Sequence, residues 1–179
     1  QMWKKWFSTE QVESMEKSLP SPYSNLYIDR DNFLYTSSAG AGAGKALKHL
    51  NMLGVNILQP AEKKFGHGVF GDLEVSYDNG EEVASAFVDV CVTESGLLCG
   101  ADATRGRLFL YDADCNLVAI WGGSGQRRGT FKALAAVERQ GDSFLALDSE
   151  KASLTVFEPT AYMRRVLDAL TFYSAGKYI

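Results

Sequence analysis

The chain is poor in the residues from which metal centres and disulfide frameworks are built. Its 179 residues include three cysteines and two histidines. No Cys-x-x-Cys pair or Cys/His cluster occurs, which argues against a zinc site. Cys91, Cys99 and Cys115 are odd in number and are interpreted as buried free thiols, with a disulfide or a reactive thiol as the alternative. His49 and His67 belong to no recognisable Ser/His/Asp set.

Excess positive charge and long apolar runs are also lacking. The net charge of −4 would repel a phosphate backbone, so nucleic acid is not an expected partner. No apolar run approaches the roughly 20 residues that span a bilayer. Segment 40–45 is glycine-rich and ends in a lysine, but Ala39 and Ala46 stand where a phosphate-binding loop needs a glycine and a hydroxyl. We therefore expect no cofactor.

What the chain does contain is one strand–turn–strand pattern in three copies, which start near Tyr23, Phe87 and Phe131. The first two copies align without a gap at an offset of 64 residues, and Asp102 aligns with Asp148 at an offset of 46. Self-similarity at such spacings indicates a repeat architecture. Sets of four short strands at these spacings are typical of β-propeller blades.

We therefore predict an all-β fold of three four-stranded antiparallel blades, which would form half of a six-bladed ring. The blades are expected at about 22–60, 87–123 and 131–158, with a long connection at 60–86. In the first blade the four strands are placed at 24–29, 32–37, 45–51 and 55–59. An incoming segment, 1–21, carries a predicted helix at 8–19 that begins with a capping box.

A second helix is expected near the end of the chain. After Pro159 the apolar period changes from 2 to 3.6, and Thr160 is placed to cap the helix. The residues expected to share one apolar face are Tyr162, Val166, Ala169, Leu170 and Tyr173.

The second and third copies resemble blades of the NHL-repeat type. The residues that carry the resemblance are 102–112 (DATRGRLFLYD), the glycine-rich exit 117–131, and the strands 145–148 and 154–157. Trp121 stands where that family has phenylalanine, and the first copy has Ser38 in place of the family's aspartate. The resemblance implies a propeller and carries no settled biochemical activity.

A broader resemblance covers nearly the whole chain. The chain is similar to bacterial envelope proteins in which an exported NHL-type propeller leads into tetratricopeptide-like helices and then a Yip-type membrane domain. The resemblance implies that 159–179 begins the helical region and that this chain is the C-terminal half of a propeller. It also implies an extracytoplasmic location, with membrane attachment only through regions outside this chain.

Two groups of polar residues are candidate sites. Asn25 and Asp89 are equivalent by the offset of 64, so both are expected to face one channel mouth. A basic cluster on turns is either a solvated loop face or a binding surface, and it comprises Arg105, Arg107, Arg127 and Arg128. Asp102 and Asp148 end equivalent strands and are expected to accept N–H bonds from the following turn, with a metal or catalytic role as the alternative.

These features favour a non-catalytic binding or interaction module whose ligand is another protein or a cell-surface glycan. The alternative is a metal-dependent propeller hydrolase or lyase whose site, with Asn25 and Asp89 as partial ligands, is split between this half and the missing blades. A purely structural spacer is a third reading. Three blades would leave two apolar faces open, so we also expect pairing with missing blades or with a second copy of the chain.

Overall fold

The computed structural model describes residues 23–38, 46–58, 70–71, 76–78, 81–174 and 176. The helix predicted at 8–19, the glycine-rich segment 39–45 and His67 lie outside these residues.

The described strands form three separate antiparallel meanders and one hairpin. The first sheet has the order β1 (Asn25–Ile28), β2 (Leu34–Ser37), β3 (Leu47–Leu50). The second has the order β6 (Phe87–Val92), β7 (Leu98–Asp102), β8 (Arg107–Tyr111), β9 (Leu117–Gly122). The third has the order β10 (Leu134–Gln140), β11 (Ser143–Asp148), β12 (Ser153–Phe157). A small hairpin, β4 (Ser76–Asp78) and β5 (Glu81–Val83), lies in the connection before β6.

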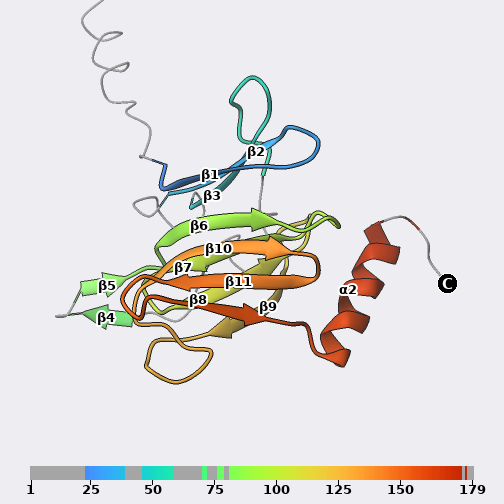
Figure 1. Cartoon of the computed structure of the whole chain (residues 1–179). Coiled ribbons are helices and arrows are strands. Elements are labelled where there is room, and N and C mark those ends of the chain that lie inside the picture. Colours follow the sequence, from blue (N-terminus) through green and yellow to red (C-terminus); the bar gives the residue numbers. More distant parts are fainter. Residues whose placement is uncertain are drawn as a thin grey trace, which may run out of the picture.

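The second sheet is the centre of the molecule because both of its faces are covered. One face packs on the first sheet in a cluster that includes Leu47, Val90 and Phe109. The other face packs on the third sheet in a cluster that includes Leu108, Val137 and Ala146. Figure 1 shows the first sheet on one side of β6 and the strands β10 and β11 on the other. β7 is buried at every position, and its sequence therefore lacks the apolar–polar alternation of a half-exposed strand.

The registers confirm the internal repeat. Asn25 pairs with Ser37 in the first sheet, and Asp89 pairs with Ala101 in the second, both at the offset of 64 residues. The innermost strands of the second and third sheets are each bulged at the same place, between Phe87 and Asp89 and between Leu134 and Ala136. A bulge re-aims the side chains that follow it, so shared bulges indicate shared backbone geometry.

The prediction of four strands in every copy is correct only for the second sheet. In the first copy, 55–58 forms no strand and contributes a single bridge between Leu50 and Asn56. Here the Asn56 side chain takes over part of the backbone pairing: its Oδ1 accepts the N–H groups of His49 (3.0 Å) and Leu58 (3.2 Å), while the Ile57 N–H still donates to the His49 carbonyl at 2.7 Å. In the third copy Pro159 follows β12 and the chain turns into a helix instead of a fourth strand.

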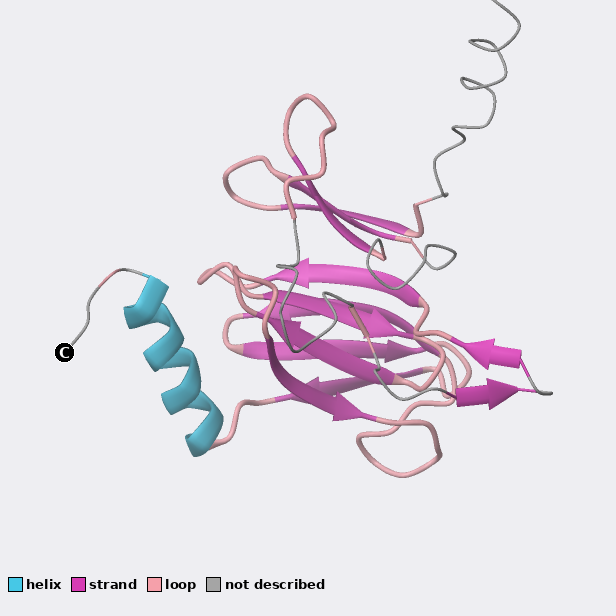
Figure 2. Cartoon of the chain, turned by 180° about the vertical axis from the view of Figure 1, so that it is seen from behind, coloured by secondary structure: helices cyan, strands magenta, loops and turns pink. Residues whose placement is uncertain are grey.

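That helix is α2 (Ala161–Ser174), and it begins as predicted. Thr160 caps it, because its Oγ1 accepts the Met163 N–H at 3.2 Å. The predicted apolar face is only partly correct. Leu170 packs on the core as predicted, but Tyr162, Ala169 and Tyr173 are exposed. Leu167, which the prediction did not include, also packs on the core. α2 stands at one end of the strands and the β4–β5 hairpin at the other (Figure 2). Among the described residues, no helix has the length and apolar character to cross a membrane.

Gly100 on β7 lets the first and second sheets approach closely. A Cβ at this position would lie 2.7 Å from the Phe87 ring and 3.2 Å from Leu47 Cδ1, and both side chains are fully buried. We expect Gly100→Ala to lower the free energy of unfolding by about 1–3 kcal/mol through overpacking, measured by urea denaturation. In a Phe87→Leu background the same change should cost less, because the smaller side chain makes room. Additive effects in the double variant would contradict the contact.

Candidate functional site

The two polar residues predicted to share a channel mouth line the same hollow. Asn25 on β1 and Asp89 on β6 border a space of about 300 Å³ whose walls also include Ala136 and Val137 of β10. The hollow therefore runs along the innermost strands of all three sheets.

Within this hollow, Asp89 is already engaged by the protein. It is buried; its Oδ1 accepts the Val90 N–H at 2.8 Å, and its Oδ2 accepts the Val137 N–H at 2.7 Å. The second bond joins β6 to β10, so the carboxylate links the innermost strands of two sheets. Burial raises the pKa of Asp89, and the two backbone donors oppose this shift.

Asn25 differs from Asp89 although it holds the equivalent position. Asp89 accepts the Val137 N–H of the next sheet, and Val90 is the residue equivalent to Val137 in the repeat. The Val90 N–H, which would be the equivalent donor to Asn25, is already donated to Asp89. The buried Oδ1 of Asn25 accepts no hydrogen bond from the described residues. It is therefore a buried polar atom without a partner among the described residues, beside the hollow that Asn25 borders.

The two equivalent aspartates, Asp102 and Asp148, have the structural role that their position predicts. Asp102 accepts the N–H of Thr104 in the following turn at 3.0 Å and that of Ala86, at the start of the same sheet, at 2.8 Å. Asp148 accepts N–H groups from Glu150 at 3.1 Å and Lys151 at 2.9 Å. Asp102 thus links the end of β7 to the chain that enters β6, and Asp148 likewise links the end of β11 to the chain that enters β10.

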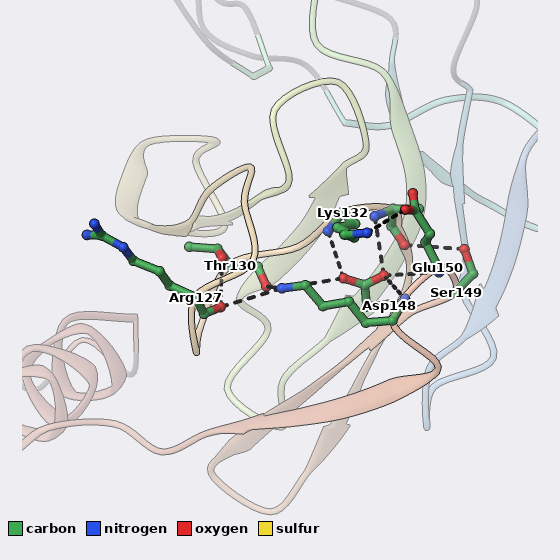
Figure 3. Close-up of polar contacts among 8 residues, drawn as sticks. Arg127, Thr130, Lys132, Asp148, Ser149 and Glu150 are labelled. Carbon is green, nitrogen blue, oxygen red and sulfur yellow. Dashed lines mark hydrogen bonds and ion pairs between the residues drawn. The ribbon is translucent and has the colours of Figure 1, made fainter.

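Figure 3 shows Asp148 as the centre of a wider network. Besides the turn, its carboxylate accepts the backbone N–H groups of Lys132 (2.7 Å) and Ala133 (3.3 Å). Burial alone would raise the pKa of Asp148, but the four backbone donors outweigh it and lower the pKa below its ordinary value of 3.8. The ionised form is therefore the one that the fold requires.

The basic cluster is divided by the structure. Arg127 and Arg128 border a hollow of about 430 Å³ together with Lys151 and the β12 residues Ser153 and Thr155. Arg105 turns toward the β4–β5 hairpin, where its guanidinium donates to the Val83 carbonyl at 2.9 Å. Arg107 begins β8 and does not border the hollow. Only the Arg127–Arg128 pair therefore presents a shared surface.

The loop that carries this pair has a fixed shape. Thr130 donates from both its N–H and its hydroxyl to the Arg127 carbonyl, at 3.1 and 2.7 Å. The Lys151 ammonium donates to the Thr130 carbonyl at 2.7 Å, and the ring of Phe131 is buried below the loop. The Arg127 guanidinium points away from this network (Figure 3). Among the described residues, neither Arg127 nor Arg128 is ion-paired with a carboxylate.

Sequence reasoning missed two features around these sites. Lys151 belongs to no motif, although its place three residues after Asp148 is a usable signal.

At the opposite end of the strands, Glu94 forms ion pairs with Arg30 of the first sheet at 2.6 Å and Arg139 of the third at 3.3 Å. Arg30 and Glu94 differ by the offset of 64, so the repeat itself contained that pair. Arg30 and Glu94 are largely exposed, so their pair adds little stability, whereas the side chain of Arg139 is mostly buried.

The cysteines lie as expected for buried thiols. Cys91 and Cys99 face each other across β6 and β7, both are free, and both are fully buried. Burial raises the pKa of the Cys99 thiol well above its ordinary range, which disfavours the reactive thiolate. Cys115 is not disulfide-bonded, and it differs from the expectation because it is only half-buried, at a turn.

Asp148→Asn should destabilise the protein mainly at neutral pH. The amide has one acceptor oxygen where the carboxylate has two, so buried N–H donors lose partners, and we expect the melting temperature near pH 7 to fall by ~5 °C. Because the pKa of Asp148 is lowered in the folded state, its stabilisation is present above its ordinary pKa and lost as pH falls through the lowered value. The gap between wild type and variant, followed by circular dichroism, should therefore narrow below about pH 4. Asp112→Asn, in a more exposed turn with similar bonds, is the control; an equal loss there would contradict a special role for Asp148.

Comparison with known proteins adds no assignment. No family model and no curated protein matches the chain. Among solved structures, it is similar to the crystal structure of the computationally designed Ika4 protein, at 13% identity over 79% of this chain and 94% of that chain. The TM-score of that match is 0.37, which is too low to support a statement about fold or function.

Proposed function

We propose that the three sheets are successive blades of an NHL-type β-propeller. Three observations support this. The first and second sheets share a register, and the second and third share a bulge position. The central sheet is covered on both faces, and the first strands of all three sheets line one hollow. Separate meanders stacked face to face about a common hollow are the arrangement that a propeller requires. On this proposal the chain provides half of a six-bladed ring, and the envelope location follows from family resemblance alone.

We further propose that the chain is a non-catalytic binding module. The observation that carries this proposal is the Arg127–Arg128 loop, which is held by hydrogen bonds from Thr130 and Lys151 and borders a hollow. A guanidinium is a planar fork of donors that matches a carboxylate with two hydrogen bonds. Because the loop is already ordered, little conformational entropy would be lost when a ligand binds.

The chemistry of the hollow favours a carboxylate-bearing protein segment as the ligand. Its lining combines two arginines, one lysine and the hydroxyls of Ser153 and Thr155. None of the described residues that line it is aromatic and could stack on a sugar ring, so a protein is favoured over a glycan. The chain as a whole is acidic, so binding of an acidic partner would depend on this local charge.

The test is binding of a fluorescein-labelled oligoglutamate peptide, followed by fluorescence anisotropy. We expect the Arg127→Ala/Arg128→Ala double variant to weaken binding at least ~10-fold, the loss of about 1.4 kcal/mol or more. Arg164→Ala/Arg165→Ala is the matched control, because it removes an adjacent exposed arginine pair from α2 instead. Equal losses in the two variants would overturn the proposed surface, and binding of hyaluronan but not the peptide would assign it to glycans.

The enzyme alternative rests on one observation, the unpartnered Oδ1 of Asn25 beside Asp89. Against it, both Asp89 oxygens already bind backbone N–H groups. Within the described residues, no three His, Cys, Asp or Glu side chains are grouped as a metal site.

We therefore expect titration with Mg²⁺, Ca²⁺, Mn²⁺ and Zn²⁺ to give no saturable heat in isothermal calorimetry. Half of a split site would already offer some oxygen ligands, so weak binding is measurable in this chain. A saturable signal that disappears in Asn25→Leu would favour the enzyme instead.

A further inference from the structure

The outer face of the third sheet is apolar and exposed, although its equivalents in the second sheet are buried. Leu147, Leu154 and Val156 are 42%, 57% and 53% exposed. At the offset of 46 residues they correspond to Ala101, Leu108 and Leu110, which are at most 1% exposed. Those three residues are buried because the third sheet covers them.

The outer face of the first sheet shows the complementary pattern. Tyr23, Leu26 and Ile28 are 52%, 60% and 56% exposed. At the offset of 64 residues they correspond to Phe87, Val90 and Val92, which are at most 4% exposed because the first sheet covers them. We call these two exposed surfaces the trailing face (third sheet) and the leading face (first sheet).

The two open faces are therefore the two halves of the junction that the chain already forms twice. At each internal junction, the trailing face of one sheet packs on the leading face of the next. The described part of the chain displays one exposed trailing face and one exposed leading face. Contiguous exposed apolar patches of this kind mark interaction sites.

We propose that a second copy of this chain covers both faces, head to tail. The trailing face of each copy packs on the leading face of the other, and the two junctions close a ring of six sheets. A contact between unlike faces forms a closed assembly when its rotation completes a circle, and otherwise forms a filament. The ring closure rests on the proposed propeller, whereas it does not depend on the Arg127–Arg128 ligand.

Charge supports the pairing of unlike faces. Lys48 lies on the leading face, opposite Thr36 in the strand register. Its position is equivalent to that of buried Phe109 in the second sheet. Glu138 lies on the trailing face, opposite Leu145 in the strand register. Its position is equivalent to that of buried Cys91 in the second sheet. A junction between unlike faces places a face that carries a cation against a face that carries an anion, whereas a junction between like faces would place equal charges on both sides.

The first experiment measures mass in solution by size-exclusion chromatography with multi-angle light scattering. At about 100 µM the full chain should have twice the monomer mass. Leu154→Glu and Leu26→Glu each place a charge on one open face and should shift the protein at least ~10-fold toward monomer. Leu117→Glu is the matched control, because Leu117 on β9 is 45% exposed but belongs to neither face, and it should stay dimeric.

Mixing the two variants separates unlike-face pairing from like-face pairing. One intact junction remains when a Leu154→Glu chain meets a Leu26→Glu chain, so native mass spectrometry should detect a mixed dimer that neither variant forms alone. A monomeric wild type, a dimer unaffected by either variant, or the absence of a mixed dimer would each overturn the proposal. Circular dichroism of each variant checks that the sheets remain folded. Because Leu154 also borders the Arg127–Arg128 hollow, the peptide-binding assay reports separately on the ligand proposal only in the Leu26→Glu variant.

Discussion

Burial of the second sheet on both faces is the interaction on which the rest of the structure depends. Its side chains are too apolar for either face to remain in water, so it needs a sheet on each side. Gly100 and Ala101, adjacent on β7, face opposite neighbours, and their small size allows close approach on both sides. The first and third sheets are placed by this requirement, and the candidate sites follow from their placement.

Polar groups between the sheets act mainly as structural connectors. Asp89 joins β6 to β10, and Asp102 and Asp148 each fasten the end of one strand to the start of another. These carboxylates satisfy backbone N–H groups that would otherwise be buried without partners. The aspartates that the sequence offers as catalytic candidates therefore hold backbone groups in place. The charged groups that can contact a ligand, Arg127 and Arg128, lie on a loop.

The predictions that succeeded depend on local or periodic signals. The repeat offset placed Asn25 and Asp89 in one hollow, and the turn chemistry of Asp102 and Asp148 followed from their position at strand ends. The predictions that failed required knowledge of the neighbours. The sequence of 55–59 does not show that the Asn56 side chain would accept the N–H of His49 in β3. The spacing of apolar residues in α2 is compatible with more than one buried face.

The sequence by itself determined that the chain would form short antiparallel strands in repeated meanders, because alternation, turn residues and a fixed offset are written in neighbouring positions. Only the tertiary structure decided which charged side chains are available. Arg105 and Arg127 look alike in the sequence, yet one binds the β4–β5 hairpin and the other points away from its network. Side-chain availability depends on residues distant in the chain, and sequence spacing does not encode those distances.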